Sequence, residues 1–166
     1  GAAGSVVVPS MEGTRPILIE VQSLVGSTSF GMPRRTAIGV DHNRVSLLTA
    51  VMDKICGIHL GASDIFLNVA GGVKVDETAI DLGIVSSMAS SFLNRPVAKG
   101  TVVFGEVGLT GEIRGISQTE VRIKEASRMG FARCILPRTR NREGAQRPNI
   151  ELIPIRSLKE LTENLF

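Results

Sequence analysis

Side chains suited to nucleophilic or metal chemistry are few in this sequence. The 166 residues include two histidines, His42 and His59, and two cysteines, Cys56 and Cys134. Neither histidine lies in an H-x-x-x-H pattern and the cysteines form no C-x-x-C pair, so the spacing predicts neither a zinc site nor a His-based triad. We expect both cysteines to be reduced and buried as small hydrophobic side chains.

No phosphate-binding loop is present. The pattern G-x-x-x-x-G-K-[ST] does not occur, so we expect no ATPase activity from this chain by itself. Val69–Lys74 contains paired glycines but lacks the Lys-Ser/Thr that opens a P-loop helix, which favours a tight turn. We therefore expect neither a cofactor nor a metal in this chain.

Without a histidine base, a nucleophilic hydrolase would need a serine–lysine pair. The candidates are Ser86, Ser87, Ser90 and Ser91 with Lys99 or Lys124. All four serines fall inside an expected helix rather than on a strained turn, and no signal for an oxyanion hole lies near them. The pattern disfavours peptidase chemistry.

Arginine is the residue type that clusters. The pI is about 9.2 and the formal net charge is +3. One cluster contains Arg34, Arg35 and Arg44. A second cluster, whose stretch of sequence includes the single acid Glu143, contains Arg133, Arg138, Arg140, Arg142 and Arg147. Guanidinium groups in loops bind phosphates. We expect DNA contacts at Arg34, Arg35, Arg44, Arg138, Arg140 and Arg142.

Such contacts should be made mainly to phosphates. Tyr and Trp are absent and Phe occurs six times, so little material exists for stacking on unpaired bases. The alternative for the arginine clusters is a solvated loop, or pairing with acids across a subunit interface. Lys124 and Arg128, with Glu125 beside them, favour ordinary surface solvation.

Apolar periodicity and glycine punctuation indicate alternating strands and helices. The expected strands are 5–9, 15–25, 36–40, 64–70, 101–105, 134–137 and 150–155, with a hairpin at 108–115. The expected helices are 41–56, 78–94, 117–129 and 157–165. Early hairpins followed by βα units predict a single α+β domain with a mixed sheet over residues 1–166. No run is long and apolar enough to cross a membrane.

Two helix starts fit a capping box. Thr78 is followed three residues later by Asp81, and Ser117 by Glu120. In that motif the hydroxyl caps the helix and the acid reaches back to the N-cap amide. The pattern therefore predicts a structural role for both acids.

Four segments closely resemble the C-terminal domain of the bacterial RadA (Sms) family of DNA repair proteins: Gly31–Arg44, Asn68–Lys74, Phe104–Arg114 and Arg122–Ala126. The resemblance covers essentially the whole chain. It implies a Lon-protease-like fold, of the ribosomal S5 domain 2-like class, assembled as a homohexameric ring. It also implies a zinc finger and a RecA-like ATPase, with their zinc, ATP and Mg²⁺, in parts of the full-length protein outside this chain.

Lon proteases place a catalytic serine just before one helix and a lysine at the start of the next. The resemblance puts Asp81 at the serine position and Glu120 at the lysine position. Two carboxylates do not give an alkoxide activated by an amine base, so peptidase activity should be absent. If the fold brought the two together, one would be protonated or a cation such as Mg²⁺ would bind.

The expected function is therefore that of a non-catalytic DNA-binding and oligomerisation domain. By the resemblance, its full-length protein would be a cytoplasmic bacterial ATPase of recombinational repair and branch migration, with no membrane contact. The alternative is a pure ring-forming scaffold that does not touch DNA. Salt-dependent DNA affinity separates the two, because a scaffold would assemble without binding.

Overall fold

The first two strands are rich in Val and Ile and form a long antiparallel hairpin around the turn at Gly13. A computed structural model describes residues 1–29, 31–139 and 149–166 of the chain. β1 (Ser5–Glu12) pairs with β2 (Arg15–Ser27), and Gly13 between them takes the φ of 63° that the turn needs. One face of β2 buries Ile19 and Val21 in the core.

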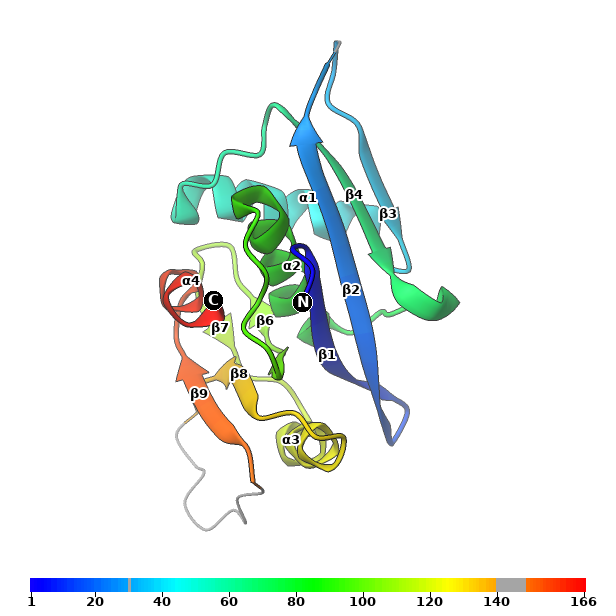
Figure 1. Ribbon diagram of the computed structural model, residues 1–166, viewed down its shortest axis with the longest axis vertical. Helices are drawn as coiled ribbons and strands as arrows, with labels where there is room; N and C mark the ends of the chain where they lie inside the picture. Colours follow the sequence, from blue (N-terminus) through cyan, green and yellow to red (C-terminus); the bar gives the residue numbers. More distant parts are fainter. Residues whose placement is uncertain (30, 140–148) are drawn as a thin grey trace.

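The larger sheet contains seven strands in the order β3-β4-β2-β1-β5-β8-β9 (Figure 1). β2 is antiparallel to β1 and β4, whereas the other neighbouring pairs are parallel, so the expected mixed sheet is confirmed. β1 and β5 pair only at Val7 and Val102. β6 and β7 form a separate two-stranded hairpin. The remaining strands are β3 (Arg35–Ile38), β4 (Ser63–Val69), β5 (Thr101–Val103), β6 (Glu106–Val107), β7 (Ile113–Arg114), β8 (Arg133–Pro137) and β9 (Glu151–Ile155).

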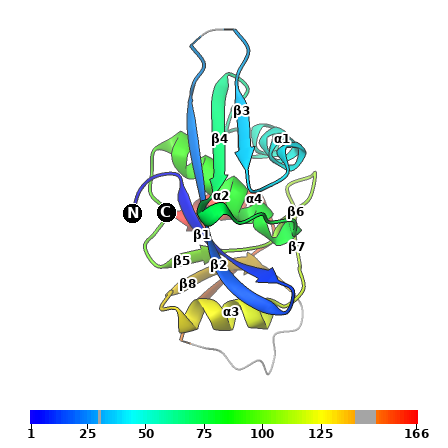
Figure 2. The ribbon, with the colours of Figure 1, turned by 90° about the vertical axis from the view of Figure 1, so that its right-hand side faces the viewer.

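Four α-helices lie in the described part of the chain: α1 (His42–Val51), α2 (Asp81–Leu93), α3 (Thr119–Arg128) and α4 (Leu158–Leu165). α1 continues as a π-helical turn over Met52–Cys56, and a 3-10 turn over Thr78–Ile80 leads into α2. Figure 2 shows α1 on one side of the β3-β4-β2 part of the sheet, and α3 at the opposite end of the molecule.

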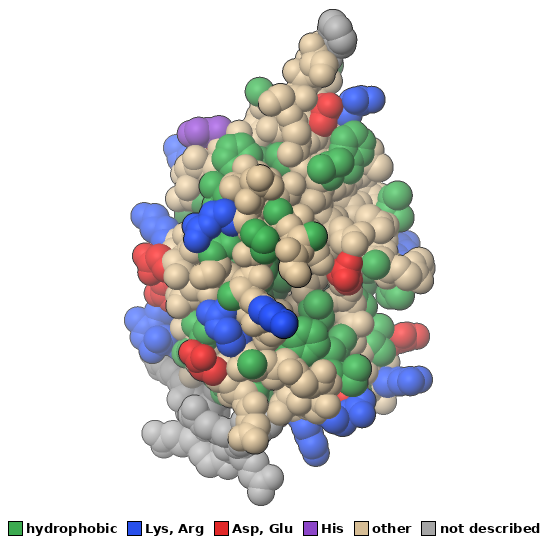
Figure 3. Space-filling view, viewed as in Figure 1, with side chains coloured by type: hydrophobic (Ala, Val, Ile, Leu, Met, Phe, Trp, Pro, Cys, Tyr) green, Lys and Arg blue, Asp and Glu red, His purple; other side chains and the backbone are tan. Residues whose placement is uncertain are grey.

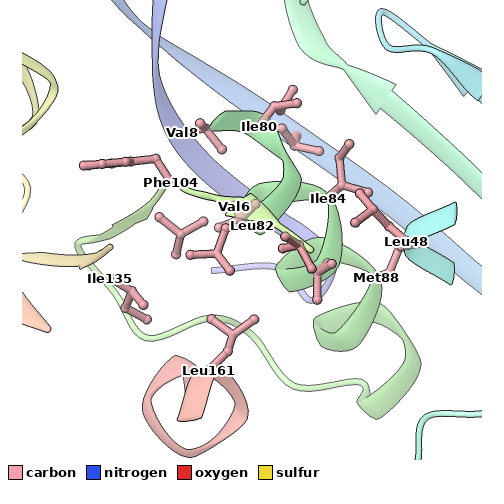
Figure 4. Packing of buried hydrophobic residues seen from close by; sticks show 14 of the residues in the cluster. Val6, Val8, Leu48, Ile80, Leu82, Ile84, Met88, Phe104, Ile135 and Leu161 are labelled. Atoms are coloured by element: carbon pink, nitrogen blue, oxygen red, sulfur yellow. The ribbon is translucent and has the colours of Figure 1, made fainter. Parts of the chain in front are cut away.

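The core is built around α2, whose residues from Asp81 to Ser90 are all buried. Figure 4 shows its apolar side chains meeting those of β1, α1, β8 and α4: Leu82, Ile84 and Met88 with Val6, Val8, Leu48, Ile135 and Leu161. A Cβ at Gly83 would overlap the Val8 side chain, so glycine is what allows α2 to approach β1 so closely.

Most expected elements are confirmed, with boundaries shifted by a few residues. Asp41 caps α1 as its position suggests, accepting a 3.0 Å hydrogen bond from the Asn43 N–H, and Gly57 follows with a φ of 67°. Cys134 is buried as expected, but Cys56 is only half-buried because it lies in the last turn of the helix. None of the described helices is long and apolar enough to cross a membrane.

Candidate functional site

Asp81, at the start of α2, is fully buried and held by two neighbouring elements. The Arg44 guanidinium of α1 donates to both carboxylate oxygens, with Nε 2.8 Å from Oδ1. The Val107 N–H of β6 donates to Oδ2 at 3.0 Å. The carboxylate therefore joins α1, α2 and β6, and it presents no free oxygen to solvent.

Burial raises the pKa of Asp81, and the hydrogen bonds from Arg44 and Val107 offset part of that increase. The nearby Glu106 adds to the increase by repulsion. In return, the hydrogen bond to Asp81 raises the pKa of Arg44. Because Arg44 supplies the opposite charge at contact distance, we regard the pair as ionised at neutral pH.

Glu120 lies elsewhere, exposed in the first turn of α3. Within the described residues it shares no hydrogen bond or ion pair with Asp81. No group of three or more potential metal-ligating side chains gathers in those residues either. The charge opposite Asp81 is that of Arg44.

Neither expected capping box forms. α2 begins at Asp81 after the 3-10 turn, and Thr78 makes no side-chain cap. The Asp81 carboxylate is already taken by Arg44 and Val107, which is why it does not reach back. At α3 the N-cap is Gln118 in the left-handed conformation, with a φ of 61°, so Ser117 stands one residue too early to cap the helix.

The serines of α2 serve packing. Ser87 Oγ lies 2.7 Å from Ser23 Oγ of β2, and Ser91 Oγ accepts from the Val25 N–H at 2.9 Å. Ser90 Oγ accepts from the Gly4 N–H at 2.9 Å and donates to the Arg95 carbonyl. Ser86 is also buried, and its Oγ lacks a hydrogen-bond partner among the described residues. These hydroxyls attach the N-terminal segment and β2 to the central helix.

Arg34 presents the more accessible cation of the first arginine cluster. Its side chain is 76% exposed, and it forms a 3.5 Å ion pair with Asp64. The Arg34 N–H donates to Asp64 at 2.7 Å, which is the main reason that the pKa of Asp64 is lowered. Arg35 is half-buried and donates to the Leu60 carbonyl at 2.9 Å. Arg44, as described above, is bound to Asp81.

The second cluster is only partly within the described residues. Arg138 is exposed directly after β8, and its N–H donates to the Ile155 carbonyl at 2.9 Å. Arg140 and Arg142 lie outside the described residues. Strands β4, β2, β1 and β5 separate β3, which holds Arg35, from β8. At about 4.8 Å per strand, Arg35 and Arg138 lie towards different ends of one subunit.

A buried ion pair between Arg122 and Glu77 was not anticipated from the sequence. Arg122 of α3 is 1% exposed. Its guanidinium donates to Glu77 at 2.5 and 3.1 Å, to the Pro9 carbonyl at 3.1 Å and to the Ser117 carbonyl at 3.0 Å. One signal for it was present: Arg122 stands four residues before the buried Ala126, on the same helical face.

Comparisons with known proteins show which family the chain belongs to. A family model described as subunit ChlI of Mg-chelatase matches residues 19–140. The chain is 54% identical over 161 residues to the DNA repair protein RadA of Bacillus subtilis, which covers 96% of the chain and 35% of that protein. It is 52% identical over 164 residues to RadA of Halalkalibacterium halodurans, covering 98% and 36% respectively.

A third relative, RadA of Listeria monocytogenes, is 49% identical over 144 residues, covering 87% of the chain and 31% of that protein. The chain thus spans about a third of the length of these curated relatives. The family-model match spans most of the mixed sheet and reaches from β2 to the end of β8. We conclude that the chain belongs to the family described as subunit ChlI of Mg-chelatase and is homologous to about one third of the DNA repair proteins named RadA.

Proposed function

We propose that this chain is a non-catalytic domain that binds DNA through its phosphates and joins copies of itself into a ring within a longer repair protein. The observation that supports it best is the exposed Arg34, beside Arg35, on a chain about half identical to proteins named for DNA repair. Phosphate contacts by arginine position a protein on DNA without selecting a sequence.

The same proposal includes a Lon-protease-like fold that has lost its chemistry. Asp81 at the head of α2 and Glu120 at the head of α3 stand where that fold would carry a nucleophile and a base. Burial of Asp81 against Arg44 favours a structural role for that position. We assign any zinc or ATP-Mg²⁺ chemistry to those parts of the longer relatives that lie outside this chain.

Fluorescence anisotropy with a labelled duplex, at several salt concentrations, tests DNA binding. With four to six phosphates neutralised, log affinity should fall with log salt at a slope of about −4 to −5. Arg34→Ala/Arg35→Ala should weaken binding to every sequence alike and reduce the slope by up to about 2. Lys124→Ala/Arg128→Ala removes the same charge from exposed positions that the sequence assigns to ordinary solvation, and it is the matched control.

Two results would overturn the DNA-binding proposal: a slope near zero for the unaltered chain, or equal losses in the test and control variants. The pure scaffold would then remain. Peptidase silence is tested separately with unfolded casein, for which we expect no cleavage. Cleavage that disappears in Ser86→Ala or Ser90→Ala would show that the domain is an enzyme.

A further inference from the structure

Among the described residues, no helix covers one face of the β3-β4-β2 part of the sheet. α2 packs on β2 on the core side, and α3 covers the other side only towards the β1–β2 turn. Three apolar side chains remain outside: Leu24 is 64% exposed, Ile38 57% and Phe66 37%. Leu24 and Phe66 are directly paired across β2 and β4. Figure 3 shows hydrophobic side chains gathered over this part of the sheet.

We call this surface the open face and define it by Leu24, Ile38 and Phe66, with the polar neighbours Gln22, Thr36 and Asn68. These six residues line a shallow hollow of about 270 Å³. Pockets for small molecules usually measure about 300–1,000 Å³, so the hollow is better suited to one or two inserted side chains. Contiguous apolar surface of this kind usually marks a protein contact.

The rim of the open face is basic. The Arg34 guanidinium lies over the Phe66 ring, 5.9 Å from its centroid, and Arg35 follows it in β3. Asp64 beneath them is buried and offsets one of the two positive charges. A partner should therefore bring an apolar side chain flanked by acids.

The β6–β7 hairpin has those properties. Leu109, at its tip, is 67% exposed. The turn beneath it is held by the Gly108 N–H donating to the Glu112 carbonyl at 2.9 Å and the Gly111 N–H donating to the Gly108 carbonyl at 3.0 Å. Both the hydroxyl and the N–H of Thr110 donate to the Glu112 carboxylate, at 2.8 and 3.1 Å. Leu109 is thus presented to solvent on an ordered turn.

The hairpin is also acidic. Glu106 and Glu112 flank the tip, and Arg114 pairs with both, which leaves a net charge of −1 for these three side chains. Hydrogen bonds, chiefly from the Thr110 hydroxyl, lower the pKa of Glu112 to about 2, so it is ionised at any physiological pH. This charge opposes the net positive rim of the open face.

The two surfaces face different directions. Figures 1 and 2 show α1 behind the β3-β4-β2 part of the sheet and the open face on its other side, while the β6–β7 turn projects on the side of α1. A single subunit cannot bring them together. Contact between two different surfaces of identical subunits is heterologous and repeats head to tail, closing into a ring when the rotation permits.

We propose that the open face of one copy receives Leu109 and the β6–β7 hairpin of the next copy. The inference rests on the self-association included in the proposed function, and it names the two surfaces that would produce it. Leu109 would enter the hollow beside Phe66 and Ile38, with Glu106 and Glu112 on the side of the basic rim. Because the proposed function assigns Arg34 to DNA, Arg34→Ala/Arg35→Ala is sedimented as well and should assemble like the unaltered chain. A contact made by one short hairpin should bury less than the roughly 1,200 Å² of a stable interface, so we expect each junction by itself to be weak.

Two variants isolate the two sides of the junction. Leu109→Asp removes the inserted side chain and leaves the open face intact. Leu24→Asp/Ile38→Asp blocks the open face and leaves the hairpin intact. All three positions are exposed, so the variants should fold, which circular dichroism checks. Leu109→Gln is a neutral second version, and Met129→Asp, 54% exposed and on neither surface, is the control.

Sedimentation at high protein concentration gives the result. The unaltered chain and the control should form species heavier than 17.7 kDa, and each junction variant should remain at 17.7 kDa. Mixing the two junction variants restores one intact junction, so a 1:1 dimer of twice that mass should form. If either junction variant assembles like the unaltered chain, or if the mixture stays monomeric, this inference is overturned and the proposed function is not. A strictly monomeric unaltered chain overturns self-association itself.

Discussion

A charged side chain at a fully buried helix start survives only when its neighbours replace the water it has lost. Asp81 achieves this with one guanidinium and one backbone N–H, drawn from α1 and β6. The same carboxylate without Arg44 would be an unpaired buried charge, which is among the most destabilising features that a substitution can create. The pair therefore accounts for a carboxylate at this buried helix start.

Replacing Arg44 with Met should lower the free energy of unfolding by about 3 kcal/mol at neutral pH. Without the hydrogen bond from Arg44, which lowers the pKa of Asp81, burial raises that pKa further. The native state then keeps a proton that the unfolded chain releases near a pH of about 4, so the variant loses stability as pH rises above that value. Urea unfolding at acidic and neutral pH measures the widening difference from the unaltered chain.

The double variant Arg44→Met/Asp81→Asn is the control, because it removes the unpaired charge and keeps an oxygen for the Val107 N–H. It should be more stable than Arg44→Met alone at neutral pH. A loss of stability in Arg44→Met that does not change with pH would show that packing, and not the charge of Asp81, is responsible.

Contacts between elements place α2 and α3 on the strands of the sheet. Gly83 allows α2 to lie against β1, and Arg122 joins α3 to Pro9 of β1 and to Glu77 of the segment that precedes α2. Burial would raise the pKa of Glu77, but the hydrogen bonds from Arg122, Ser10 and Met11 outweigh it and lower the pKa. The ionised form is therefore the one that stabilises this junction.

Glu77→Gln should lower the free energy of unfolding by about 3 kcal/mol at neutral pH, because Arg122 is left buried without its counter-ion. The lowered pKa means that Glu77 stabilises the fold above its ordinary pKa of 4.5 and loses this contribution as pH falls below it. The gap between the variant and the unaltered chain should therefore narrow in acid, as followed by urea unfolding.

Glu125→Gln is the matched control for that experiment. Glu125 also pairs with an arginine, Arg128, but that partner is 67% exposed. Exposed pairs contribute about 0.2–1 kcal/mol, so the control should change little. Equal effects of the two substitutions would contradict a special role for the buried pair.

Gly83→Ala should destabilise the fold by about 1–3 kcal/mol, because the added methyl group overlaps Val8 in a closely packed core. Gly26→Ala provides the comparison, since a Cβ there meets no atom within 4 Å and the backbone is not left-handed. Thermal unfolding should show a clear fall in Tm for the first and little change for the second. Similar Tm values would mean that α2 can shift to accept the methyl group.

At the scale of the whole molecule, the sheet separates Arg34 from Arg138. Arg34 stands beside β3 at one edge, and Arg138 follows β8 near the other, so a DNA segment that met both in one subunit would have to pass along the molecule. In a ring, the ends of neighbouring subunits could instead share one duplex. Both arrangements make the two arginines independent contacts.

Arg34→Ala and Arg138→Ala should therefore weaken duplex binding additively in free energy, since the sites are far apart and share no partner. Each should reduce the salt slope by about 1. Anisotropy titrations of the single and double variants measure both quantities. A double variant no weaker than the worse single variant would show that only one cluster meets the DNA.

The sequence by itself determined the order of the elements and the character of the core. The Val- and Ile-rich run in 15–25 and the apolar spacing within 41–56 act locally, so strands and helices could be assigned within a few residues. The cap at Asp41 and the left-handed Gly57 are local as well, and they coincide with the expected helix bounds of 41–56. The mixed sheet followed from the alternation of hairpins and βα units.

Only the tertiary structure decided what the charged side chains do. The sequence predicts the same capping role for Asp81 and Glu120. In the structure Asp81 is buried against Arg44 of another helix, whereas Glu120 is exposed. Arg34, Arg44 and Arg122 all pair with carboxylates distant in sequence, but the Arg34 side chain is exposed, whereas that of Arg122 is buried. Local propensity acts over a few residues, whereas the partner of a charge is set by which elements the fold packs together.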